Sequence, residues 1–281
     1  SSSTTFTPMA TTAYTLSGTD GTCSRTASIT ITSADTPSRL TLSQGMSKTN
    51  CSERIDSLMV NGGFVTQSGK IGSGTATNTS STPFRRWFGG SRSQALYTPA
   101  ELTALGLVNG SIISSIGWVA LSGTPAAMGS TTNFSITAGF VTAATLGAAF
   151  ITGDINTVFS ASSYVPSTGI GNLDFALSTP LTWDGSSHLL VASCFNNNDG
   201  GGVSSNNISV ESTTVASGLN LYLSQDNNAT VCTNTTAPTT TTNRPNLRLT
   251  YSVPNVTWSP TTGIFTNSAA TTPYSSGHAA K

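Results

Sequence analysis

This chain of 281 residues has very little charge. Asp, Glu, Lys and Arg make up 8% of it, against about 25% in a typical soluble domain. The 11 basic and 11 acidic residues give a formal net charge of zero. A chain without net charge has no field to attract nucleic acid or an anionic membrane, so we expect neither as a partner.

Long apolar runs and metal-binding residues are also scarce. No apolar run approaches the ~20 residues of a membrane-spanning helix, so we expect no membrane span. The chain has two histidines and four cysteines, and the cysteines are too far apart for a zinc knuckle: Cys23, Cys51, Cys194 and Cys232. They form either the disulfides Cys194–Cys232 and Cys23–Cys51 in an oxidising compartment, or free buried thiols. We predict no metal and no cofactor.

The chain is rich in β-branched and aromatic runs separated by turn residues, from about residue 71 to 253. This pattern predicts an all-β fold, a β-sandwich of the immunoglobulin-like or jelly-roll-like kind. One short helix is expected within it. Thr98 can cap this helix, Pro99 begins it, Glu101 stands three residues after the cap, and Gly106 ends it.

Two stretches predict β-hairpins. The first is LDFALSTPLTWDGSSHLLVASCF, residues 173–195, with a turn at Asp184-Gly185 and a buried second strand. The second is ATTAYTLSGTDGTCSRTASITIT near the N-terminus, with a turn at Asp20-Gly21. Because a lone hairpin is marginal in water, the N-terminal ribbon should pair with a further strand.

Several stretches resemble giant secreted surface proteins of the Bacteroidota. TPMATTAYTLSGTDGTCSRTASITI resembles the second half of an immunoglobulin-like repeat of these proteins, and NVTWSPTTGIFTNSAATTPYSSG resembles its first half. PFRRWFGGSRSQALYTPAELTALGLVNGSIISSIGW, TPLTWDGSSHLLVASCFNNN and TNRPNLRLTY are similar to a β-sandwich module of the same class.

The resemblance implies four segments and a window of a tandem array. Residues 1–34 would be the second half of one repeat, 35–70 a connecting strand segment, 71–253 the main β-sandwich module, and 254–281 the first half of the next repeat. The chain begins at SSSTTF without an initiator Met, so we expect a mature product or part of a longer chain.

The same resemblance implies a function. Such modules are exported, often by the type IX route, and are linked to adhesion or surface fibres. We therefore expect a non-enzymatic, extracellular, cell-surface module whose partners are copies of itself or neighbouring repeats. The alternative is a carbohydrate-binding sandwich of a larger secreted protein, with surface glycans as partners.

The candidate ligand or interface residues lie in and near FRRWFGGSR. Arg85, Arg86 and Arg92 flank Trp87 and Phe88, and Trp and Arg are frequent in interface hot spots and on sugar rings. Alternatively, the aromatic rings enter the core and the arginines extend to the surface. Trp118 is a further candidate sugar platform.

Two other patterns suggest chemistry more weakly. Ser186 or Ser187 could form a hydrolytic triad with His188 and Asp184, but all of them would lie on one hairpin with no nucleophile elbow. A histidine in a turn or at a strand edge is therefore favoured. The loop of residues 196–202 offers oxygen ligands for Ca²⁺, but only Asp199 in it is charged. A glycine-rich connection is therefore the preferred interpretation of that loop.

Overall fold

The computed structural model describes most of the chain. It covers residues 63–202 and 207–255, the strand segments 12–19, 24–31, 41–42, 58–61 and 279–280, and the single residues 265, 271 and 273. Within this part of the chain, no helix is long and apolar enough to cross a membrane.

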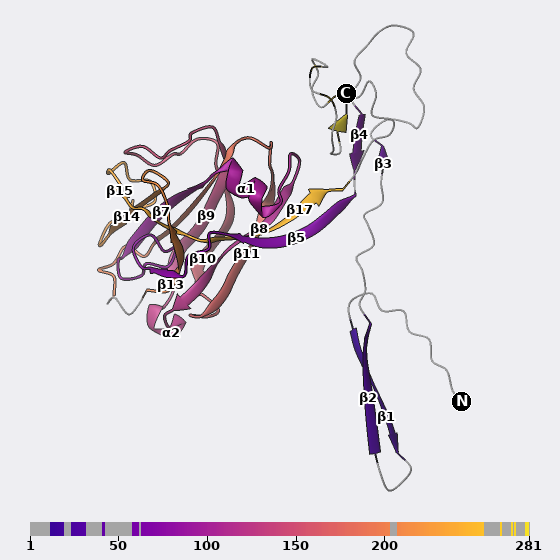
Figure 1. The fold of residues 1–281 in the computed structure, drawn as a ribbon. Helices are drawn as coiled ribbons and strands as arrows, with labels where there is room; N and C mark the ends of the chain where they lie inside the picture. The colour runs from indigo at the N-terminus through magenta and orange to yellow at the C-terminus, as the bar shows by residue number, and fades with distance from the viewer. Residues whose placement is uncertain are drawn as a thin grey trace.

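The main body is a sandwich of two antiparallel sheets (Figure 1), which confirms the predicted fold class. The six-stranded sheet has the order β10 (Asn156–Tyr164), β9 (Thr131–Val141), β12 (His188–Asn196), β7 (Gly90–Tyr97), β14 (Asn220–Gln225) and β15 (Thr239–Thr240).

The seven-stranded sheet is built around β8 (Ile112–Ser122). One edge of β8 pairs with β11 (Gly171–Thr182), and the other edge pairs with β17 (Leu247–Pro254) and then with β13 (Ser209–Thr214). The remaining strands are β5 (Phe64–Ile71), which pairs with β17, and β6 (Ala76–Asn78) and β16 (Asn243–Pro245), which pair with β13.

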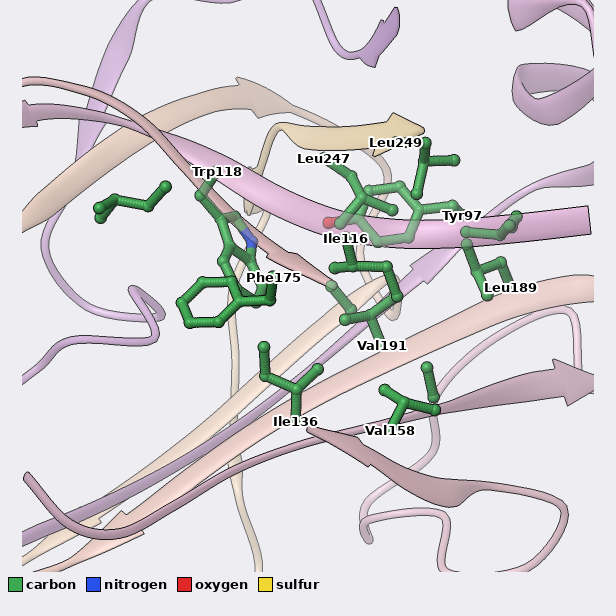
Figure 2. Close-up of a cluster of buried hydrophobic side chains, with 14 of the residues drawn as sticks. Tyr97, Ile116, Trp118, Ile136, Val158, Phe175, Leu189, Val191, Leu247 and Leu249 are labelled. Carbon is green, nitrogen blue, oxygen red and sulfur yellow. The ribbon is translucent and has the colours of Figure 1, made fainter. Parts of the chain in front are cut away.

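The core lies between the two sheets (Figure 2). Alternate residues of each strand point inward, because successive side chains of a strand point to opposite faces. Ile136 of β9, Val191 of β12 and Ile116 of β8 are among the fully or almost fully buried members. Trp118 packs edge-on against Phe175 at 5.7 Å between ring centroids.

The six-stranded sheet is also covered on its outer face. Leu96, Leu190 and Leu221 form a second cluster with Phe150 and Ile151 of the β9–β10 loop. Gln94 of β7 fixes this loop, since its side-chain amide donates to the carbonyl of Ile151 and accepts from the same residue's N–H, at 2.6 and 2.9 Å. β7 is therefore buried on both faces along its whole length.

The prediction that residues 173–195 form a β-hairpin is wrong, because its two strands do not pair with each other. Its turn is present, and β12 is buried as expected, but β11 pairs with β8 in one sheet whereas β12 pairs with β7 and β9 in the other. The segment crosses from sheet to sheet. Turn chemistry at Asp184-Gly185 reverses the chain in either case, so the local pattern does not distinguish the two.

The sandwich begins earlier in the sequence than predicted, with the strand β5. It pairs with β17 from Phe64↔Pro254 to Ile71↔Leu247, so residues that we expected in a connecting segment belong to the seven-stranded sheet.

The predicted helix is present as α1 (Pro99–Leu105) with every expected cap. The Thr98 hydroxyl accepts from the Glu101 N–H, the Glu101 carboxylate accepts from the Thr98 N–H, and Gly106 ends the helix at φ 106°. A second, one-turn helix, α2 (Pro125–Met128), was not predicted.

Two small sheets complete the described strands. β1 (Thr12–Thr19) and β2 (Ser24–Ile31) form the predicted N-terminal ribbon. β3 (Thr41–Leu42), β4 (Leu58–Asn61) and β18 (Ala279–Ala280) form a three-stranded sheet, in which the last strand of the chain pairs with β4.

Candidate functional site

The FRRWFGGSR stretch is divided between the core, the surface and the outer face of the six-stranded sheet. Phe84 is fully buried and stacks on Phe134, with ring centroids 5.8 Å apart. Trp87 is 45% exposed, the exposed indole of this stretch. The prediction that aromatic rings of this stretch enter the core is therefore correct for Phe84, whereas the Trp87 ring is exposed at the surface.

Around Trp87 lies a surface of rings and one guanidinium, which we call the Trp87 surface: Arg85, Trp87, Phe88 and Tyr222. The Arg85 guanidinium carbon lies 4.7 Å from the Phe88 ring centroid and 4.9 Å from that of Tyr222. Burial lowers the pKa of Arg85, and Tyr222 partly offsets this effect. Tyr222 comes from β14, far along the chain, so no local pattern predicted its place beside Arg85.

Arg86 and Asp199 tie the Trp87 surface to the loop after β12. The two Asp199 oxygens accept from the two Arg86 terminal nitrogens, one of them at 3.1 Å, and Asp199 also accepts from the Gly201 N–H. The one carboxylate of the suggested calcium loop is therefore neutralised by an arginine. Across the part of the chain that the structure describes, no three His, Cys, Asp or Glu residues cluster as a metal site.

Trp118 is not available as a sugar platform, which corrects that prediction. It is 3% exposed and lies between Phe84 and Phe175 in the core. The alternation of β8 places its ring inward, where an apolar ring is most stable, and only the neighbouring strands could have revealed which face of β8 is inside.

Arg92 lies on the opposite face of the six-stranded sheet from Arg85. Arg85 donates to Ser224, whose hydroxyl also bonds that of Ser91, whereas Arg92, the next residue along β7, points to the outer face and stacks on Phe150 at 4.2 Å. Neighbouring residues of a strand point to opposite faces. The sequence cluster of three arginines is thus not one site.

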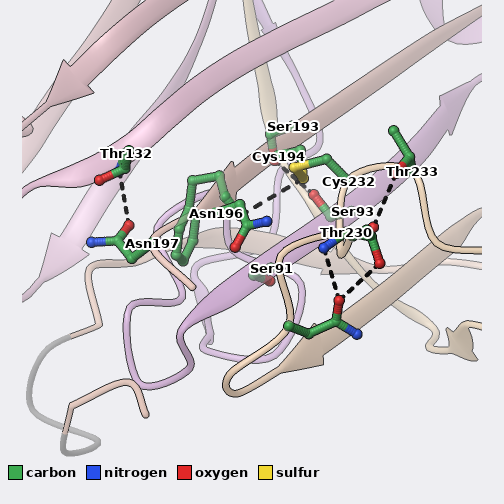
Figure 3. The surroundings of a disulfide bond; sticks show 12 residues. Ser91, Ser93, Thr132, Ser193, Cys194, Asn196, Asn197, Thr230, Cys232 and Thr233 are labelled. Carbon is green, nitrogen blue, oxygen red and sulfur yellow. Dashed lines mark hydrogen bonds between the residues drawn. A yellow bond between two sulfur atoms is a disulfide. The ribbon is translucent and has the colours of Figure 1, made fainter. Parts of the chain in front are cut away.

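The cysteine pair Cys194–Cys232 forms a disulfide, with the two Cα atoms 5.7 Å apart (Figure 3). It fixes the loop after β14 to the centre of the six-stranded sheet, where Cys194 and Val231 pack with Leu223. Cys23 and Cys51 lie outside the described residues.

Asp184 serves its own turn. Its carboxylate accepts from the Ser186 N–H at 2.8 Å and from the Ser187 N–H at 2.7 Å. Burial alone would raise the pKa of Asp184, but the hydrogen bond from the Ser187 hydroxyl, together with those from the Ser187 and Ser186 N–H groups, outweighs burial and lowers it. Among the described residues no side-chain hydrogen bond reaches His188, so the three residues do not form the arrangement that a triad needs.

A buried ion pair was missed by the sequence analysis. Arg244, 1% exposed, donates to the Leu96 carbonyl at 2.7 Å and to both carboxylate oxygens of Glu101, and its guanidinium carbon lies 4.4 Å from the Tyr97 ring centroid. Glu101 was recognised only as a helix cap. The two residues are 143 positions apart, and no local pattern connects them.

No protein-family model matches this chain, and a search of curated proteins finds no match. The resemblance to repeat surface proteins therefore stays a prediction that depends on the quoted motifs.

Proposed function

We propose that this chain is a non-enzymatic, extracellular structural module of a surface fibre, adhesin or appendage, and that it assembles by strand pairing through the β1–β2 ribbon. One observation supports this most. β1 and β2 pair residue by residue from Thr12↔Ile31 to Thr19↔Ser24, and among the described strands they pair with no other. As far as the described residues go, each strand keeps one edge without a partner, and free strand edges are templates for pairing with another chain.

Two further properties support the proposal. The disulfide Cys194–Cys232 is typical of proteins outside the reducing cytosol. The zero net charge gives neighbouring copies little electrostatic repulsion, so they can pack closely.

The test is whether the full chain assembles through the ribbon. Leu16 and Ala27 are register partners in the middle of the ribbon. Replacing both with proline removes two backbone donors and should break the ribbon. We expect the unaltered chain to form oligomers or filaments at high concentration by light scattering and electron microscopy, and the variant L16P/A27P to remain monomeric.

The matched control is L16T/A27T, because threonine favours strands. It should assemble like the unaltered chain, and all three proteins should show the same thermal unfolding of the sandwich. If the unaltered chain stays monomeric at every concentration, or if the proline variant assembles equally well, the proposal is wrong.

A second candidate, carbohydrate binding, is favoured by the Trp87 surface alone. An exposed indole beside a second ring and a guanidinium can stack on a sugar. Glycan-array binding that Trp87→Ala abolishes, and that the core substitution Trp118→Phe leaves intact, would favour this function. If the unaltered chain binds no glycan on the array, carbohydrate binding is excluded as its function.

A further inference from the structure

A cavity of about 200 Å³ lies on the outer face of the six-stranded sheet. Its lining comes from β7, β9, β10 and β12, from the β9–β10 loop, and from the disulfide. Since one water takes up ~30 Å³ in the liquid, the cavity has room for more than a single water. The residues that matter here are Arg92, Ser135, Thr137, Thr157, Ala192 and Cys232.

Arg92 brings a charge into this cavity without a counter-charge. Its side chain belongs to a residue that is 9% exposed, and the cavity lining contains no Asp or Glu. Within the described residues its guanidinium has no hydrogen bond and no ion pair. It makes a cation–π contact with the Phe150 ring. An arginine cannot lose its proton to escape burial, so this charge persists.

The cavity lining also includes hydroxyls that have no partner among the described residues. Ser135 and Thr137 occupy outward positions of β9, and Thr157 occupies the neighbouring position of β10. No hydrogen bond from these three side chains to another described residue is present, so each hydroxyl can donate to a ligand. The guanidinium and the hydroxyls together form a set of donors around one space.

Part of the lining is apolar. Ala192, Ile155 and the disulfide sulfurs carry no charge, and Phe150 covers one face of the guanidinium. These apolar groups leave the guanidinium and the hydroxyls as the groups that can bind a charged ligand there.

We propose that this cavity binds a small carboxylate, held by the Arg92 guanidinium fork and by the hydroxyls of β9 and β10. Arginine matches a carboxylate with two parallel hydrogen bonds, which a lysine cannot reproduce. The carboxylate can belong to a free acid or to an acidic sugar, and the two sources share this chemistry. The inference does not depend on the proposed assembly, because the β1–β2 ribbon contributes nothing to the cavity.

The test is a titration of the full chain with sodium glucuronate, sodium acetate and glucose, followed by calorimetry and by NMR shifts. We expect saturable binding of a carboxylate probe and none of glucose, which has the sugar ring but no charge. Glucuronate binding more tightly than acetate identifies an acidic sugar as the source, and equal binding identifies a free acid.

Three variants make the test specific. Arg92→Met should weaken carboxylate binding about tenfold or more, Arg92→Lys should weaken it by less, and Thr137→Val should weaken it slightly. Arg248→Met is the matched control, because Arg248 pairs with Asp174 on the other sheet, and it should bind like the unaltered chain. Far-UV circular dichroism checks that each variant folds.

Two results would overturn the inference. One is the failure of both carboxylates to give saturable binding up to tens of millimolar. The other is undiminished binding by folded Arg92→Met, since the bound anion would then lie elsewhere. Neither result affects the assembly experiment, which uses the ribbon variants.

Discussion

Two buried arginines of this sandwich have opposite surroundings. Arg244 of β16 contacts the Glu101 carboxylate, the Leu96 carbonyl and the Tyr97 ring, and only its Nε lacks a partner. Arg92 of β7 is also buried, but the Phe150 ring is the only partner that its guanidinium has among the described residues. The Arg244 guanidinium is surrounded by groups of the fold, whereas the Arg92 guanidinium faces the cavity.

This difference distinguishes a charge that is paired within the fold from a charge that is available to bind a ligand. Arg244 joins the first turn of α1 to β16, so its partners are part of the fold, and removing one leaves a charge uncompensated. The partner of Arg92 is not within the described part of the protein, which is what a ligand site requires. The same residue type therefore has two roles that its burial alone does not distinguish.

The largest effect should come from opening the disulfide beside Arg92. The variant C194A/C232A releases a link between residues 38 positions apart, and the chain-entropy model then predicts a loss of about 4 kcal/mol in the free energy of unfolding. Urea unfolding of the oxidised protein and the variant measures this.

The same variant should affect the two arginines differently. Carboxylate binding at Arg92 should fall because Cys232 lines that cavity, whereas the contribution of Glu101 to stability should be unchanged. A loss below about 1 kcal/mol would show that the loop after β14 is held by its packing and not by the disulfide.

The next effect comes from breaking the Arg244 pair. Glu101→Gln keeps the side-chain acceptor of the capping box but leaves the Arg244 charge unpaired. Breaking a buried pair in this way costs about 3 kcal/mol, and water at the 31% exposed Glu101 side chain should keep the loss at or below that value. Urea unfolding measures it.

The control for Glu101→Gln is Asp174→Asn, at the exposed Arg248 pair. Both side chains of that pair reach solvent, 26% and 42% exposed, so the loss should be below about 1 kcal/mol. Equal losses in the two variants would mean that burial does not determine the strength of these pairs.

Sequence patterns predicted what is local in this molecule. The cap of α1 was predicted residue by residue, because Thr98, Pro99, Glu101 and Gly106 act on neighbouring backbone groups. The all-β class followed from the short alternating runs.

Long-range placement could not be predicted from the sequence. Whether β11 and β12 share a sheet depends on β7, β8 and β9, and the burial of Trp118 depends on Phe84 and Phe175. The pair Glu101–Arg244 and the contact of Arg92 with Phe150 could not be predicted for the same reason, because each joins residues that are far apart in the sequence.

A smaller effect is the pH dependence of the Arg244 pair. Burial raises the pKa of Glu101, but hydrogen bonds from Arg244 and from Thr98 outweigh it and leave the pKa below its usual value. The pair therefore stabilises the fold above the unfolded pKa of about 4.3, and this stability is lost as the pH falls through the lower folded pKa. The penalty of Glu101→Gln should be complete at pH 6 and shrink below about pH 4, as urea unfolding across this range would show. A penalty that stays constant down to pH 3 would contradict it.

The smallest effect on stability should come from Arg92→Met, and it tests the comparison directly. Methionine keeps much of the side-chain volume and removes the charge. At Arg92 the lost contact with Phe150 is offset by the removal of a charge that has no counter-charge among the described residues, so the free energy of unfolding should change by less than about 1 kcal/mol in either direction. Arg244→Met should cost clearly more, because it removes a hydrogen bond to the Leu96 carbonyl and leaves Glu101 unpaired. Equal losses at the two sites would mean that Arg92 has a structural partner, and the cavity would then need no ligand to explain its charge.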